Sequence, residues 1–153
     1  TVLGFLEALA AALGCRTLRY AAGDRALYHA AAVTASNSVV ALLEVAAALW
    51  QSAGLERAEA LAALLPLTRS ALAAVETLGT AQGLTGPVVR GDATTVARHL
   101  DALRTLSSEA IQLYADLAQA TLTLAVRSGR LEAGPAETLR ALLNSVRTGS
   151  ADA

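Results

Sequence analysis

The chain has 153 residues, enough for one domain with a sizeable hydrophobic core. It is 54% hydrophobic but only 3% aromatic and 16% charged, so alanine, leucine and valine form most of its apolar mass and favour helices. The net charge is −1 without any block of like charge, and all 12 basic residues are arginine, which argues against nucleic-acid or acidic-membrane binding and excludes lysine Schiff-base chemistry.

The low charge content also bears on assembly. Soluble domains carry roughly 25% charged residues, so a monomer of this composition leaves large apolar patches in water. Such patches usually mark contact surfaces between chains. We therefore expect a homo-oligomer, most simply a dimer.

Cys15 is the only cysteine, so the chain can form neither an intrachain disulfide nor a CxxC metal site. A half-buried thiol in a reducing compartment is the simplest interpretation. We therefore expect a cytoplasmic protein.

The first third of the chain is predicted to hold two helices joined by an extended segment. A short helix covers residues 2–13 and ends at Gly14, and residues 17–20 are extended. Asp24 then serves as the N-cap of a long helix over residues 24–52. This helix is about 42 Å long, enough to form the spine of a domain or of a dimer.

A charge-free stretch inside the long helix, residues 26–43, raises the question of a membrane span. Its polar residues are His29, Thr34, Ser36, Asn37 and Ser38. Because alanine dominates the apolar positions, a buried core helix is the preferred interpretation, and no membrane contact is expected.

A second long helix is predicted over residues 55–78, with Pro66 inside it. Proline removes one backbone hydrogen bond, so Pro66 should kink or split this helix. The loop that follows, residues 79–91, reads GTAQGLTGPVVRG and is rich in turn-forming residues.

The remaining helices carry clear boundary signals. Asp92 caps a helix over residues 92–103, a further helix covers residues 107–126, and Pro135 lies in the first turn of a last helix. Residues 148–153 form a frayed tail. The fold class is therefore all-α, a single helical domain of about six helices with one long central helix.

Polar residues on the apolar long helix are the first candidates for function. His29, Ser36, Asn37 and Glu44 are 7, 1 and 7 residues apart, a spacing that places them on one helix face. Such a set forms either part of a binding site or a buried polar network.

The second candidate set lies in TGPVVRGDATTVARHL, which begins at Thr85. Thr95 and His99 share a helix face at i and i+4, one turn beyond the cap Asp92. Arg90 together with the backbone N–H groups of the helix start can bind an anion. Ordinary helix capping is the alternative interpretation.

Two segments, LYHAAAVTASNSVVALLEVAAALW and LLPLTRSALAAVETLGTAQGLTGPVVRGDATTVARHL, resemble a bacterial family of Rossmann-like proteins. These proteins have a C-terminal helical domain and are distantly similar to ketopantoate reductase and pyrroline-5-carboxylate reductase. The resemblance covers residues 24–125. It implies that residues 23–147 are a helical dimerisation and substrate-side domain, an interlocked homodimer, and that residues 1–22 are a remnant of a preceding Rossmann domain.

The resemblance also implies a cleft between the two domains that holds a small anionic substrate. The residues expected to bind it are Tyr28, Ser36, Asn37, Thr85, Gly86, Arg90 and Thr95. No NAD(P) is expected on this chain, since a phosphate-binding loop after a strand is required to position the nicotinamide.

Three functions remain open from the sequence. The first is the substrate-side and dimerisation domain of a reductase, without hydride transfer of its own. The second is a metal-dependent hydrolase of phosphoesters or related esters, in which His29, His99 and Asp92 hold Zn²⁺, because two histidines and a carboxylate form a common catalytic zinc site. The third is a module that binds a small anion without chemistry.

Overall fold

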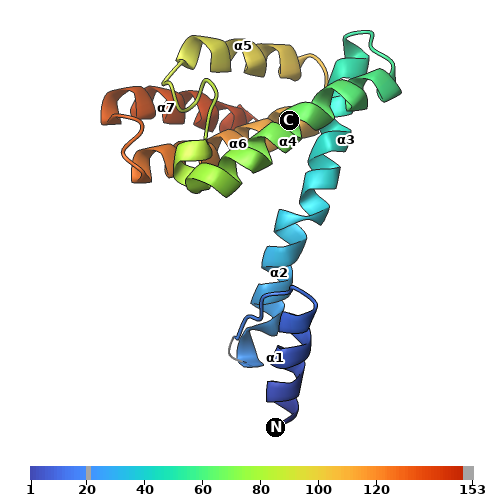
Figure 1. Ribbon diagram of the computed structural model, residues 1–153. Helices are drawn as coiled ribbons and strands as arrows, with labels where there is room; N and C mark the ends of the chain where they lie inside the picture. The colour runs from blue at the N-terminus through green and yellow to red at the C-terminus, as the bar shows by residue number, and fades with distance from the viewer. Residues whose placement is uncertain (20–21, 150–153) are drawn as a thin grey trace. The chain divides into compact units, whose positions relative to one another are not determined.

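The computed structural model describes residues 1–19 and 22–149 (Figure 1). Every element of secondary structure in these two ranges is a helix, which confirms the predicted all-α fold. The chain forms two compact units, Thr1–Leu42 and Leu43–Ala153, which we name the N-terminal unit and the C-terminal unit. The domain limits predicted at residues 22 and 147 stay predictions.

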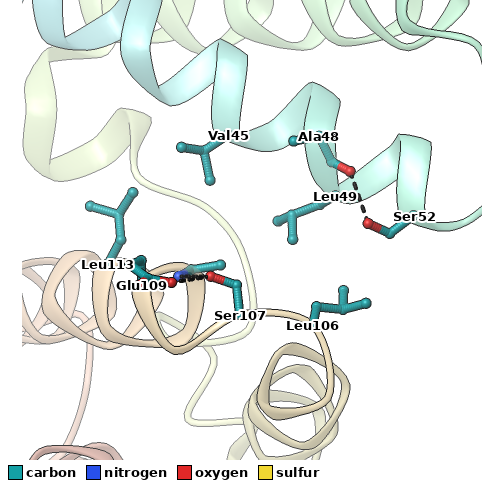
Figure 2. A pocket seen from close by; sticks show the side chains of 9 residues that line it. Val45, Ala48, Leu49, Ser52, Leu106, Ser107, Glu109 and Leu113 are labelled. Atoms are coloured by element: carbon teal, nitrogen blue, oxygen red, sulfur yellow. Dashed lines mark hydrogen bonds between the residues drawn. The ribbon is translucent and has the colours of Figure 1, made fainter.

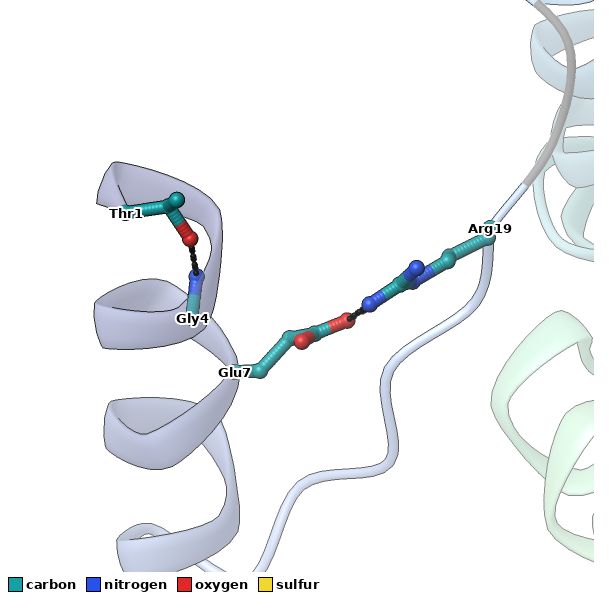
Figure 3. A network of polar contacts seen from close by, with 4 residues as sticks. All are labelled: Thr1, Gly4, Glu7 and Arg19. Carbon is teal, nitrogen blue, oxygen red and sulfur yellow. Dashed lines mark hydrogen bonds and ion pairs between the residues drawn. The ribbon is translucent and has the colours of Figure 1, made fainter.

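The N-terminal unit begins with helix α1 (Val2–Ala12). The Thr1 hydroxyl accepts a hydrogen bond from the Gly4 backbone N–H at 3.2 Å and so caps the first turn of the helix (Figure 3). Farther along α1, the Glu7 carboxylate accepts a 2.6 Å charged hydrogen bond from the Arg19 guanidinium (Figure 3). This ion pair ties the segment after α1 back to the helix.

The segment after α1 carries no regular secondary structure over residues 15–19. The predicted extension over residues 17–20 also includes Tyr20, which lies outside the described residues. Cys15 is exposed, so the expectation of a half-buried thiol is wrong. The physical reason is that Gly14 ends the helix with φ 71° and no helix of this unit covers the residue that follows.

The long helix predicted over residues 24–52 consists of two helices. After the short 3-10 turn η1 (Ala22–Asp24), α2 (Arg25–Ala35) and α3 (Asn37–Ser52) are separated at Ser36, where φ is −120° and ψ −68°. The Ser36 hydroxyl donates to the Ala32 carbonyl oxygen at 2.7 Å. Serine side chains that bond to the preceding turn compete with the helical backbone, which explains the interruption.

Helix α4 (Arg57–Gly83) continues through Pro66, so the predicted split at this proline is wrong. The non-helical residue is Gly79, with φ 76° and ψ 171°. Glycine adopts a positive φ without steric cost, and the chain turns back there. A Cβ atom on Gly83 would lie 3.0 Å from the backbone of Ala74, so only glycine permits this close return.

The three C-terminal helices pack together as the core of the C-terminal unit (Figure 1). They are α5 (Ala93–Arg104), α6 (Ser108–Arg127) and α7 (Ala133–Gly149), close to the limits predicted from the sequence. The predicted frayed tail begins at residue 148, but α7 extends to residue 149 and residues 150–153 lie outside the described part of the chain. The largest fully buried side chains belong to these helices and are Leu100, Leu122, Leu139, Leu143 and Val96.

Two segments, Arg25–Ser52 and Arg57–Gly83, are long and apolar enough to cross a membrane by length and composition alone. Only 6% of the apolar window in each is buried within the chain. Their apolar side chains are therefore largely exposed within the chain, and the expectation of a buried core helix over residues 26–43 is wrong.

Arg130 joins the loop before α7 to the end of α4. One of its guanidinium nitrogens lies 2.8 Å from the Ala81 carbonyl oxygen and 2.6 Å from that of Leu84. We expect Arg130→Ala to lower the free energy of unfolding by about 1–3 kcal/mol, because carbonyl groups at the helix end lose a charged donor. Chemical denaturation measures the change. Arg127→Ala, at an exposed position in the last turn of α6, serves as the control, and an equal loss in both variants contradicts the assigned role.

Candidate functional site

A histidine and a tyrosine meet on one side of the C-terminal core. His99 on α5 and Tyr114 on α6 are brought together by the packing of these two helices, and His99 Nδ1 lies 2.8 Å from the Tyr114 hydroxyl oxygen. Their rings meet edge to face, with centroids 5.7 Å apart and an interplanar angle of 86°. Burial raises the pKa of the Tyr114 hydroxyl, so this group stays protonated at neutral pH.

The pair borders a pocket of about 540 Å³, which we name the Trp50 pocket. Helix α3 supplies one wall and the second half of α5 supplies the other. Besides the pair, its lining consists of Leu49, Trp50, Ser52, Ala53, Ala102, Leu103 and Leu106. The pocket has the size of many small-molecule sites and is mostly apolar.

The same pair borders a second pocket of about 330 Å³, which we name the Thr85 pocket. Its remaining lining comes from the loop before α5 and from α6, and consists of Thr85, Pro87, Val88, Leu117, Ala118 and Thr121. His99 and Tyr114 thus lie in the wall of both pockets, and ligands on either side can contact them.

The Trp50 pocket extends along α3 into a third hollow of about 270 Å³ (Figure 2). The two share Leu49, Ser52 and Leu106. In Figure 2, Val45 and Leu49 of α3 face Leu113 and Leu106 across the hollow. Its acidic residue, Glu109, accepts a 2.7 Å hydrogen bond from the Ser107 hydroxyl, which holds the pKa of this carboxyl below its usual value.

The loop motif predicted as a site is partly used for capping. Asp92 Oδ1 accepts a hydrogen bond from the Thr95 backbone N–H at 2.9 Å, and Oδ2 accepts one from the Thr95 hydroxyl at 2.6 Å. These bonds lower the pKa of Asp92. Arg90 is exposed, and Gly86 has φ 104° at the turn. Within the predicted set, the structure brings Thr85 and His99 to one pocket, whereas Asp92 and Thr95 bond to each other.

The predicted residues of the N-terminal unit are exposed within that unit. Tyr28 and His29 lie on α2, and the Ser36 hydroxyl donates to the Asn37 side-chain oxygen at 3.0 Å. Glu44, on α3, belongs to the C-terminal unit and pairs with Arg57 at the start of α4, which lowers the pKa of Glu44. No buried polar or charged residue occurs in the described part of the chain, so these residues do not form a buried polar network.

The predicted zinc site stays a prediction. Among the described residues, no group of three or more His, Cys, Asp or Glu side chains is placed to hold a metal ion. Both carboxylate oxygens of Asp92 accept hydrogen bonds from Thr95, and His99 Nδ1 contacts Tyr114. His29 belongs to the other compact unit.

Sequence reasoning missed Tyr114 and Trp50. Both carry a visible signal, since Trp50 is the only tryptophan and Tyr114 interrupts an alanine- and leucine-rich helix. Their relation to His99 depends on how α3, α5 and α6 pack, which the spacing along the chain does not reveal.

One family model matches residues 1–121, and its description is "Domain of unknown function (DUF2520)". The comparison with curated proteins found no match, and neither did the comparison with solved structures. The match includes the Trp50 pocket and both residues of the His99–Tyr114 pair.

The capping role of Asp92 predicts a pH-dependent stability difference. Its pKa is lower in the folded protein than in the unfolded chain, so the ionised carboxylate stabilises the fold above the unfolded pKa. This stabilisation is lost as the pH falls through the folded pKa. We expect the difference in Tm between the protein and Asp92→Asn to narrow between about pH 5 and pH 2.

Thermal unfolding followed by circular dichroism measures this difference. Asp101→Asn, on the same helix, controls for the loss of one negative charge. A Tm difference for Asp92→Asn that is constant with pH contradicts the assigned role of the carboxylate.

Proposed function

This chain belongs to the family described as a domain of unknown function, DUF2520, and we propose that it is the helical dimerisation and substrate-side domain of a Rossmann-type reductase. DUF2520 is known as a C-terminal helical domain of ketopantoate reductase-like proteins, which supports the proposal. The dinucleotide is then held by a Rossmann domain, because its phosphate-binding turn joins a strand to a helix. This chain contributes the substrate side of the cleft.

The observation that carries the proposal is the exposed apolar surface of α4. This helix has 27 residues, yet Ala60 is its only buried residue. Leu72, Val75 and Leu78 recur at three-residue spacing, and Leu65 precedes Leu72 by two helical turns. The large apolar side chains of α4 that are between 37% and 61% exposed are Leu65, Leu67, Leu72, Val75 and Leu78.

Burial against a partner would stabilise these exposed leucine and valine side chains. Covering one leucine or valine side chain contributes about 1.5–3 kcal/mol, and a stable interface buries about 800 Å² on each partner. The continuous part of α4, residues 57–78, is about 33 Å long, which gives enough surface for such an interface. The low charge content of the chain, 16%, also favours an interface with another chain.

The charges on α4 favour a protein partner over a lipid bilayer. Arg69 lies close to the middle of the helix, with Glu76 seven residues later and Glu59 near the start. A charge at the centre of a bilayer costs several kcal/mol, whereas at the edge of a protein interface it stays in water. A second copy of the chain is the simplest protein partner, because two-fold dimers are the commonest closed assemblies.

Sedimentation velocity tests the dimer. We expect a species of twice the 15.6 kDa chain mass, and a Val75→Arg variant that dissociates at least about tenfold more readily, because an unpaired charge is buried. Val126→Arg is the matched control, since Val126 on α6 is 38% exposed and Val75 is 41% exposed. A monomeric wild-type protein contradicts the proposed dimerisation, and equal dissociation of both variants contradicts the role of α4.

NADPH binding tests the proposal that the dinucleotide is held by a Rossmann domain and not by this chain. We expect no saturable binding of NADPH to this chain. Dinucleotide sites need a turn between a strand and a helix, and the described residues form only helices. NADPH fluorescence titration measures binding, and a two-domain ketopantoate reductase serves as the positive control. Saturable binding to this chain contradicts the proposed division.

A further inference from the structure

Three rings of different chemistry meet at the Trp50 pocket. The indole of Trp50, the imidazole of His99 and the phenol of Tyr114 all contribute to its lining. Leucines and alanines form most of the remaining wall. Aromatic side chains bury large flat surfaces and pack favourably against other rings, so this lining suits a small ligand that contains a ring.

The lining also restricts the charge of the ligand. None of the nine residues around the Trp50 pocket is acidic, and none is a lysine or arginine. A charged ligand that entered the pocket would lose its hydration without gaining an opposite charge. The residues present therefore favour an uncharged ligand.

The polar pair supplies one directed hydrogen bond. A phenol has one proton to donate and can accept hydrogen bonds on its oxygen. When His99 Nδ1 carries a hydrogen, it donates to the Tyr114 oxygen at 2.8 Å and leaves the phenolic hydrogen for a ligand. Because burial raises the pKa of Tyr114, the phenol keeps this hydrogen well above neutral pH.

We propose that the Trp50 pocket binds a small, uncharged aromatic carbonyl compound, whose oxygen accepts a hydrogen bond from the Tyr114 hydroxyl. In this site His99 is a positioning residue that orients the phenol. The inference rests on the proposed substrate-side function and deepens it, because a carbonyl carbon is one of the centres to which NAD(P)-dependent reductases transfer hydride. The pocket residues of α3, α5 and α6 that the ligand contacts all lie within the C-terminal unit.

The test uses two probes of the same shape. Acetophenone carries the carbonyl oxygen, and ethylbenzene replaces it with hydrogen atoms. Because Trp50 is the only tryptophan, its indole N–H gives one NMR signal that reports on the pocket. We expect both probes to shift this signal, and acetophenone to bind more tightly than ethylbenzene.

Tyr114→Phe removes the donor and keeps the ring. We expect it to weaken acetophenone binding about 3- to 10-fold and to leave ethylbenzene binding unchanged. Ala102→Leu fills the pocket without altering the polar pair, so it should weaken both probes, whereas Ala120→Leu at an exposed position of α6 should weaken neither. The three variants need only remain folded, which circular dichroism establishes.

Three results overturn the inference. They are no shift of the Trp50 signal with either probe, equal binding of acetophenone and ethylbenzene, and an equal effect of Tyr114→Phe on both. The outcome is separable from that of the proposed function. If the protein is a dimer that binds neither probe, only the proposed carbonyl site is wrong. If it is a monomer that binds acetophenone with the expected dependence on Tyr114, only the proposed dimerisation is wrong.

Discussion

The packing of α5 against α6 and α7 is the constraint on which the rest of the C-terminal unit depends. Leu100, Leu122 and Leu139 are almost completely buried there. His99 immediately precedes Leu100, and Tyr114 immediately precedes the buried Ala115, so each polar ring lies at the edge of the core while its neighbour is inside. The 2.8 Å contact between the rings is thus a consequence of core packing, and a change in helix register would separate them.

The apolar residues of the chain fall into two groups. In α5, α6 and α7 it forms an internal core, whereas α1 and α2 bury no residue within the chain and α4 buries only Ala60. Large exposed apolar surfaces usually mark contact sites, which is the basis of the proposed dimer. In the proposed dimer a second copy covers part of this surface, so assembly would contribute to the stability of this chain.

The sequence was sufficient to predict the helix starts that depend only on neighbouring residues. The Asp92 cap, and the starts of the helices near residues 92 and 107, followed directly from the sequence, because capping involves only the next three residues. Pro66 was misleading, since one missing hydrogen bond is tolerated inside α4, and the break lies at Gly79 instead. The Ser36 interruption was also missed, because serine is compatible with a helix or with a bend depending on its hydroxyl partner.

His99 shows why the candidate site needed the structure. Its position four residues after Thr95 places it correctly on a helix face, and the metal-dependent alternative paired it with a zinc ion shared with His29 and Asp92. In the folded chain Asp92 bonds to Thr95 and His99 to Tyr114, fifteen residues away on another helix. A histidine that contacts a phenol at Nδ1 can still bind a ligand through its other nitrogen, and metal-binding histidines often make such a second contact. The rest of the Trp50 pocket lining is mostly leucine and alanine together with Trp50, which suits an apolar ligand, whereas divalent cations favour carboxylates and further histidines. The zinc site stays a prediction.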